Sequence, residues 1–191
     1  EIATIKSKSG GKMFGSSETG GFYADVSEYL KENVEKYDKI IIAGPGFSKE
    51  NLYKTLEADL KKKCNLEASS ITGKTGINEV IKRGALERVV AESRMSSETR
   101  MVEDFLAELG KESGFVTYGT AHVKKAVDAG AANSVMVSDK LVRQKEIQKI
   151  LGAAEAMKAE TAIISSTHEA GEKLLALGGI AAFLRYKFEE Q

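Results

Sequence analysis

The stretch FVTYGTAHVKKAVDAGAANSVMVSDK, residues 115–140, contains two patterns in alternation. Its first and last segments are short runs of β-branched and aromatic residues, which are typical of strands, and HVKKAVDAGA between them has the apolar spacing of a helix. The same alternation continues with a helix at 142–159, a strand at 161–166, a helix at 169–178 and a strand at 180–188. Strands and helices in alternation predict an α/β fold.

The N-terminal half of the sequence repeats this alternation around KIIIAG, residues 39–44, a continuous apolar run typical of a buried strand. Pro45 and Gly46 end the run, and Ser48 is the expected N-cap of the next helix. The further elements that we expect are strands at 2–8 and 66–71 and helices at 22–37, 48–63 and 77–92. We therefore predict a second α/β unit in this half.

A long helical pattern joins the two halves, from Gly84 to Gly114, with the signature of a new helix start at Ser96, Ser97 and Glu98. We place a domain boundary inside this pattern. The boundary divides the chain into two small α/β domains, residues 1–92 and residues 93–191. A chain of 191 residues is long enough for two domains of about 100 residues each.

The composition is that of an ordinary globular chain, with 42% hydrophobic and 29% charged residues. Lys and Arg number 28 and Asp and Glu number 28, so no net charge attracts nucleic acid or a membrane. The single cysteine, Cys64, excludes an internal disulfide and favours a reducing compartment. No apolar run approaches the ~20 residues of a membrane helix. We therefore expect a cytoplasmic protein, and the start at Glu1 rather than Met favours a fragment.

The segment SSITGKTGINEVI, residues 69–81, resembles a phosphate-binding loop because it contains Gly73, Lys74 and Thr75 in succession. The full pattern G-x-x-x-x-G-K-[ST] requires an earlier glycine, which lets the chain wrap around the phosphates. Ala68 occupies that position, inside an expected strand. We therefore predict a glycine-rich strand-to-helix turn here and no nucleotide site.

The chain's two histidines, His122 and His168, each follow an expected strand at the point where a helix begins. Such strand ends are common ligand-binding edges in α/β folds. With one cysteine and two distant histidines, the sequence has no zinc-like spacing, and no G-x-S-x-G motif accompanies the serines at strand ends. We expect no catalytic residue, no metal site and no cofactor, and we interpret both histidines as helix-start or interface residues.

A glycine-rich segment near the N-terminus, SGGKMFGSSETGG, carries Lys12 and follows Lys8. A flexible cationic loop is suited to contact with a phosphate backbone. We therefore predict that Lys8, Gly11 and Lys12 contact RNA, with a plain solvated loop as the alternative.

Four stretches together resemble the Pelota family of ribosome-rescue factors, which are relatives of eukaryotic and archaeal class I peptide-release factors. They are KIIIAGPGFSKENLYKTL (39–56), SSITGKTGINEVI (69–81), FVTYGTAHVKKAVDAGAANSVMVSDKL (115–141) and AIISSTHEAGEKLLALGGIAAFLRY (162–186). The resemblance implies a ribonuclease-H-like central domain, shortened at its N-terminus, and a C-terminal α/β sandwich similar to a ribosomal-protein fold. The family's N-terminal Sm-like domain has no counterpart in the sequence, and the C-terminus without an acidic tail resembles archaeal members.

The resemblance implies a role in ribosome rescue and mRNA surveillance (no-go and non-stop decay). Such a factor, a monomer, binds the stalled ribosome and its RNA together with an elongation-factor-like GTPase and an ABC-type recycling ATPase. Peptide hydrolysis is not expected, because release factors use a Gly-Gly-Gln loop and no Gly-Gly pair here precedes glutamine. Two alternatives stay open: an endoribonuclease that cuts stalled mRNA with a divalent metal, and a plain RNA-binding module.

The resemblance also implies a partner-binding turn after the 39–44 strand. Gly44, Pro45, Gly46 and Phe47 are expected to form a rigid turn that faces the GTPase. One exposed aromatic side chain on such a turn is a reasonable anchor for a protein partner.

A second partner site is implied at the start of the 169–178 helix. His168, Glu169 and Glu172 are expected to contact the GTPase or the ATPase, with Glu172 as a charged specificity contact. His122, at the corresponding turn after the 115–119 strand, is a weaker candidate.

Overall fold

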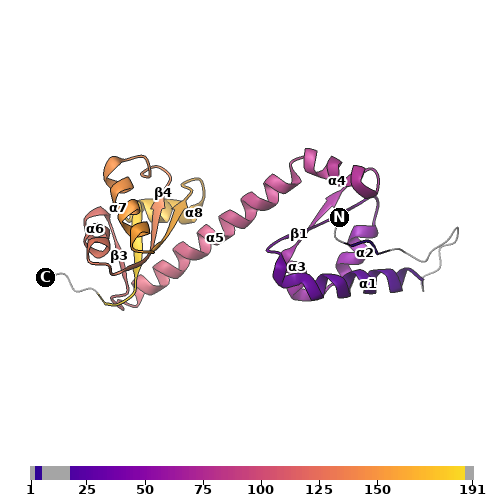
Figure 1. Ribbon diagram of the computed structural model, residues 1–191, viewed down its shortest axis with the longest axis horizontal. Coiled ribbons are helices and arrows are strands. Elements are labelled where there is room, and N and C mark those ends of the chain that lie inside the picture. Colours follow the sequence, from indigo (N-terminus) through magenta and orange to yellow (C-terminus); the bar gives the residue numbers. More distant parts are fainter. Residues whose placement is uncertain (1–2, 6–17, 188–191) are drawn as a thin grey trace. The chain divides into compact units, whose positions relative to one another are not determined.

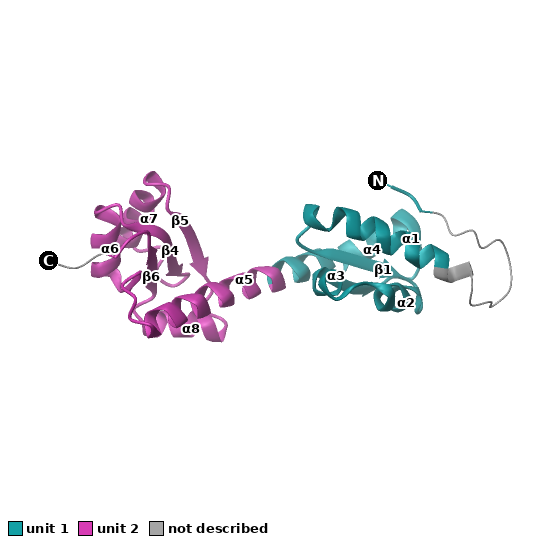
Figure 2. Cartoon of the chain, turned by 90° about the horizontal axis from the view of Figure 1, so that it is seen from below, with its two compact units in different colours: residues 1–91 teal, residues 92–191 magenta. Residues whose placement is uncertain are grey.

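The computed structural model describes residues 3–5 and 18–187 (Figure 1). The chain divides into two compact units, residues 1–91 and residues 92–191, which Figure 2 shows in different colours. The division lies within the long helix α5 (Ala85–Gly110). Each unit has a sheet and a hydrophobic core of its own.

In unit 1, two parallel strands pair side by side. Ile40 of the first strand lies opposite Cys64 of the second, and the pairing continues to Gly44 and Ala68. The elements are α1 (Glu18–Asn33), the 3-10 helix η1 (Val34–Lys36), β1 (Ile40–Gly44), α2 (Ser48–Thr55), α3 (Ala58–Lys63), β2 (Cys64–Ala68) and α4 (Gly73–Lys82).

The core of unit 1 lies between β1 and the helices α1, α2 and α3. Ile42, Leu56 and Leu60 are buried, and Leu30 and Val34 pack against them. Removal of these apolar side chains from water is the main favourable term in the folding of this unit. The packing fixes the end of β1, from which the first expected partner turn leaves.

Unit 2 has a four-stranded sheet in the order β3-β6-β4-β5. Strand β6 is antiparallel to both β3 and β4, whereas β4 and β5 are parallel. The carboxyl ends of β3, β4 and β5 therefore lie at one edge of the sheet. The elements after α5 are β3 (Val116–Tyr118), α6 (Thr120–Asp128), β4 (Ala132–Ser138), α7 (Lys145–Ala156), β5 (Glu160–Ile164), α8 (Glu169–Ala176) and β6 (Ile180–Leu184).

The sheet of unit 2 is covered on both faces, with α6 and α7 on one side and α5 and α8 on the other (Figure 1). Strand β4 shows the consequence: Val135 and Val137 belong to the core under α6 and α7, and Met136 belongs to the core under α5 and α8. Alternate side chains of a strand point to opposite faces, so a strand covered on both faces has consecutive apolar residues where it crosses the core, as Val135, Met136 and Val137 do. In the second core, the rings of Phe105 and Phe183 meet edge to face with centroids 5.8 Å apart.

The expected α/β class with two small α/β units is confirmed. The helix expected at 48–63 is two helices, because Leu56 and Glu57 have extended backbones, with ψ of 149° and 158°. This break places the Leu56 side chain in the core, where it is buried. The N-cap of α2 is Phe47 and not Ser48, which lies in the first turn.

The helix expected at 77–92 is also divided. Gly84 separates α4 from α5 and has φ of +75°, a conformation that favours glycine. The helix start expected at Ser96 to Glu98 is wrong, because α5 continues through these residues. The strand expected at 66–71 begins and ends earlier, as β2. Of the strand expected at 2–8, residues 3–5 lie outside the strands, and the others lie outside the described residues.

The Gly73-Lys74-Thr75 segment forms the first turn of α4. Gly73 has φ of +73°. Gly76 lies so close to the preceding turn that an added Cβ would stand 2.1 Å from the carbonyl oxygen of Ile71. The hydroxyl of Ser69 donates to the same oxygen at 2.8 Å. These glycines therefore allow the helix to pack on the turn before it, as expected for a strand-to-helix turn.

Candidate partner-binding sites

The first site is the turn that leaves β1. Pro45 has a fixed φ, and Gly46 adopts φ of +57°, so the chain forms a tight turn between β1 and α2. The amide of Asn51 donates to the carbonyl of Phe47 at 3.0 Å, which makes Phe47 the N-cap residue of α2. The turn is thus held between a paired strand and a helix start.

Phe47 projects from this turn with 81% of its surface exposed, the highest value among the exposed large hydrophobic residues of the described chain. Phenylalanine has no acceptor for capping the helix, so the side chain does not serve α2 in this way. A large apolar side chain left in water contributes nothing to stability through burial. What the arrangement offers is an aromatic anchor on a fixed backbone.

Lys49 closes the turn from the helix side. Its ammonium donates to the carbonyl of Gly46 at 2.6 Å and lies 3.0 Å from the carboxylate of Glu50. The carbonyl of Gly44 accepts the amide hydrogen of Ser69 at 3.3 Å, which ties the beginning of the turn to the residue after β2. These bonds restrain the backbone on both sides of Phe47.

The second site is the start of α8. His168 is the N-cap residue, and its Nδ1 accepts the amide hydrogen of Gly171 at 3.3 Å. In the neutral ring the proton is therefore on Nε2, which lies 3.0 Å from the Oε2 of Glu98 and donates to it. Both ring nitrogens are engaged, and the His168 side chain is only 13% exposed.

Glu98 comes from α5 and is the buried acid of this site, with an 8% exposed side chain. Its carboxylate accepts the amide hydrogen of Ser165 at 2.7 Å and the Nε hydrogen of Arg94 at 2.6 Å, besides the His168 bond. Burial alone would raise the pKa of Glu98, but the bonds from His168, Ser165 and Arg94 outweigh it and hold the pKa below the ordinary value. Glu98 is therefore a charged hydrogen-bond acceptor at neutral pH.

Glu169 and Glu172 lie in the first turn of α8, where carboxylates favour the positive end of the helix dipole. Both are exposed. Glu169 is paired with Lys173 at 2.7 Å, and the hydrogen bond from Lys173 lowers the pKa of Glu169. Of the three residues expected at this site, the two glutamates face solvent, while His168 holds the helix start.

His122 lies in the first turn of α6 and is exposed. It follows β3, whereas His168 follows β5, and these two strands stand at opposite sides of the sheet. With neighbouring strands about 4.8 Å apart, three spacings separate the two strands by about 14 Å. The two histidines are therefore at one edge of the sheet but do not converge on a common site.

The predicted RNA-contact residues Lys8, Gly11 and Lys12 lie outside the described residues. Within residues 3–5 and 18–187, no group of three or more His, Cys, Asp or Glu side chains could hold a metal ion. Over the same ranges, no helix has the length and apolar character needed to span a membrane.

The residue that sequence reasoning missed is Glu98. Arg94 and Glu98 are four positions apart on a helix, which is the pattern of an ordinary surface ion pair. Nothing local indicates that the carboxylate reaches the turn at Ser165, 67 residues later. Asp139, at the end of β4, holds the same turn by accepting the amide hydrogen of Ser166 at 3.1 Å.

Comparison with known proteins gives consistent matches. Residues 95–188 match the family described as eRF1 domain 3. The chain is 40% identical over 197 residues to the Pelota homologue of Thermococcus onnurineus, in a match that covers 97% of this chain and 55% of that protein. The chain thus spans about half the length of the curated relatives that it matches.

Two solved structures are similar across both units. A structure of ribosome-bound archaeal Pelota and ABCE1 has a TM-score of 0.68 and 38% identity, over 91% of this chain and 51% of that one. Dom34 of S. cerevisiae, described as a translation termination-like factor that interacts with Hbs1, has a TM-score of 0.57 and 25% identity, over 92% of this chain and 55% of that one. The chain therefore belongs to the Pelota family.

Proposed function

We propose that the protein of this chain is a ribosome-rescue and mRNA-surveillance factor that acts on stalled ribosomes in the cytoplasm. In this role it binds an elongation-factor-like GTPase and an ABC-type ATPase and promotes subunit dissociation without peptide hydrolysis. Family membership supports the class of function, because the similar archaeal Pelota is ribosome-bound with ABCE1 and the similar Dom34 interacts with Hbs1.

The observation that carries the proposal is Phe47. An aromatic side chain 81% exposed, on a turn fixed by a strand and a helix start, fits the centre of a protein interface better than it fits the stability of unit 1. The turn Gly44–Pro45–Gly46–Phe47 is then the contact for the GTPase. Glu169 and Glu172 at the start of α8 are the contact for a basic surface of the GTPase or the ATPase.

We further propose that the chain acts as an adaptor and not as an enzyme. Support comes from His168, the histidine at the end of β5, whose two ring nitrogens are both engaged and so cannot take a proton from a substrate without breaking the cap of α8. The boundary between the two compact units falls between residues 91 and 92 of the sequence, which supports a division into a central and a C-terminal domain near residue 92.

The test is binding of this chain to an elongation-factor-like translational GTPase in its GTP form, measured by pull-down and by titration. Phe47→Ala and Glu172→Arg should each weaken binding at least tenfold, which corresponds to about 1.4 kcal/mol. Tyr37→Ala, which removes another exposed aromatic from unit 1, is the matched control and should bind like the parent. Equal binding by both site variants and the parent would refute the contact assignment.

A separate measurement addresses catalysis. The chain is incubated with structured RNA and Mg²⁺ or Mn²⁺, and the RNA is examined for cleavage. The adaptor proposal expects intact RNA. Metal-dependent cleavage that a single Asp or Glu substitution abolishes would replace the adaptor by an endoribonuclease.

A further inference from the structure

We propose that Glu98 is a positioning residue for partner binding: it fixes the start of α8, and with it Glu169 and Glu172, against helix α5. The proposal rests on the proposed function, in which those two glutamates contact a partner protein with a basic surface. It assigns a role to Glu98, the one buried glutamate among the described residues of unit 2, which lies outside the expected contact sets.

Two carboxylates from different elements hold the turn between β5 and α8. Glu98 of α5 accepts the amide hydrogen of Ser165, and Asp139 after β4 accepts that of Ser166, at 2.7 and 3.1 Å. Successive amide hydrogens in a turn point to one side and favour an anion. The chain supplies its own anions for these amides, so the turn is bound at the same time to the sheet and to α5.

The first turn of α8 rests directly on this held segment. A Cβ added to Gly171 would stand 1.8 Å from the carbonyl oxygen of Ser165 and 3.0 Å from the Cα of Ser166. At such a close approach, the backbone of α8 cannot shift without moving the turn beneath it. A displacement of the turn away from Glu98 is therefore passed on to the start of α8.

Glu98 acts on the same helix start by a second route. Its Oε2 accepts from the Nε2 of His168, whose Nδ1 caps α8 at the amide of Gly171. The acid thereby fixes the orientation of the capping ring as well as the turn. Arg94, one helical turn earlier on α5, holds the other carboxylate oxygen at 2.6 Å.

The consequence concerns the exposed glutamates. Glu169 and Glu172 are three positions apart and lie on one face of α8, so a basic partner surface meets both together. Two contacts made by one rigid helix start cost less ordering on binding than two made by a mobile segment. Glu98 touches no partner in this account, and it acts by keeping the two carboxylates in place.

The experiment compares variants of the full chain by amide hydrogen exchange and by affinity for the ABC-type ATPase and the translational GTPase. In Glu98→Ala, exchange at Ser165 and Gly171 should be at least tenfold faster, and partner affinity should fall about tenfold, as expected from the loss of charge-assisted hydrogen bonds. Glu98→Gln retains one acceptor for Ser165 and should lie between this variant and the parent.

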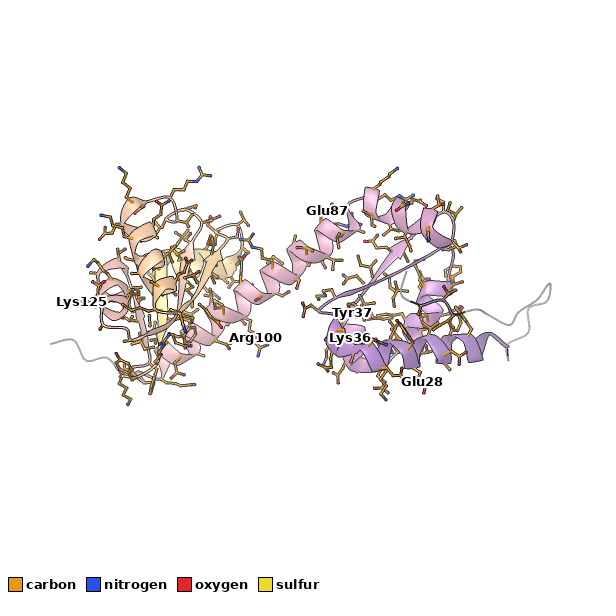
Figure 3. The ribbon with its side chains drawn as sticks, in the orientation of Figure 1. Glu28, Lys36, Tyr37, Glu87, Arg100 and Lys125 are labelled. Atoms are coloured by element: carbon orange, nitrogen blue, oxygen red, sulfur yellow. The ribbon has the colours of Figure 1, made fainter. Side chains whose placement is uncertain are left out.

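The matched control is Asp104→Ala. Asp104 also pairs with an arginine four positions away on α5, but the pair is exposed, and the Arg100 side chain projects outward from the helix (Figure 3). Both exchange and affinity should stay at the parental values in this control. His168→Asn tests the second route, because asparagine can cap α8 but cannot span the distance to Glu98; it should speed exchange at Ser165 less than Glu98→Ala does.

The outcomes separate this proposal from the proposed function. If Glu98→Ala and Glu98→Gln bind like the parent while Glu172→Arg does not, Glu98 has no positioning role and the proposed function stands. If the parent binds neither protein, the proposed function fails at this site and the positioning role fails with it, whatever the exchange rates. Should Glu98→Ala not fold, Glu98→Gln and His168→Asn decide by the same readouts.

Discussion

The turn after β1 and the turn before α8 are both strand-to-helix turns, but they differ in the exposure of the residue that caps the helix. Each follows a strand and leads into a helix, and each depends on a glycine: Gly46 lies within the first turn, and Gly171 lies in the first turn of α8, just after the second. At the first turn, the N-cap residue Phe47 has 81% of its residue surface exposed. At the second, the side chain of the N-cap residue His168 is 13% exposed and is hydrogen-bonded through both ring nitrogens. The side chain of Phe47 thus faces solvent, whereas the side chain of His168 is hydrogen-bonded within unit 2.

Contact residues and supporting residues can thus be told apart at similar motifs. Phe47 is exposed and contributes little to the stability of its own unit through burial, which fits the proposed contact with a partner. His168 and Glu98 are part of the hydrogen-bonding of unit 2, whereas Glu169 and Glu172 are exposed, which is why we propose these two glutamates as the partner contacts at that site. Exposure and hydrogen-bond partners, rather than position after a strand, distinguish the two cases.

The largest expected effect is at Gly171. Gly171→Ala places a Cβ 1.8 Å from the backbone oxygen of Ser165, where the turn cannot yield, and should destabilise unit 2 by about 3 kcal/mol or more. Gly152→Ala, on the exposed face of α7 where an added Cβ meets open space among the described residues, should instead stabilise by about 0.5–1 kcal/mol. Urea denaturation measures both, and equal effects would contradict the close packing of α8.

The next effect is at Glu98. Glu98→Ala leaves the amide of Ser165 and the Nε2 of His168 without their acceptor and should cost about 2–3 kcal/mol. Asp104→Ala removes an exposed ion pair, with an Asp104 side chain 66% exposed, and should cost less than about 0.5 kcal/mol. Thermal and urea unfolding of the two variants give the difference, and costs of similar size would mean that the Glu98 bonds add nothing to unit 2.

At the other turn, glycine is required for its backbone angle and not for space. Gly46 has φ of +57°, and an added Cβ meets no described atom within 4 Å. Gly46→Ala should therefore cost only about 1–2 kcal/mol, the energy of a left-handed conformation for an L-residue. A cost above that of Gly171→Ala would reverse the comparison between the two turns.

The pH dependence of stability gives a smaller effect. Folding lowers the pKa of Glu98, so its ionised carboxylate stabilises the folded state. This contribution to the free energy of unfolding is fully present above the pKa of the unfolded glutamate, about 4.3, and is lost as the pH falls through the lower pKa of the folded state. The parent should thus lose stability more steeply below about pH 4.3 than Glu98→Gln does. Asp139 has a lowered pKa too and titrates in both proteins, so it cancels in the difference. Parallel curves would show that Glu98 is not held as a carboxylate.

The sequence predicted the fold where the pattern is local. The run KIIIAG and the strands of unit 2 are apolar and β-branched, and each is a strand close to its expected place. The break at Leu56 was missed because burial of that side chain, a tertiary effect, overrides a continuous helical pattern. The single helix α5 was missed for the opposite reason: Ser96 and Ser97 have the residue types of a helix start, but packing of Val102 and Phe105 against the sheet carries the helix through.

In the candidate sites too, features set by local sequence could be predicted, whereas features set by tertiary packing could not. That Phe47 is an exposed aromatic could be expected from a Pro-Gly turn at a strand end. The network of Glu98 could not, because its bonds join residues that are 67 and 70 positions apart. Sequence position placed His168 at a helix start correctly, whereas its engagement with α5 depends on packing that no local pattern records.

The most direct test of the adaptor account measures two properties of Phe47→Ala together: the free energy of unfolding and the affinity for the translational GTPase. We predict a free energy of unfolding within about 0.5 kcal/mol of the parent, because the side chain is exposed, and an affinity at least tenfold lower. Parental affinity, or a loss of affinity accompanied by a matching loss of stability, would contradict the account.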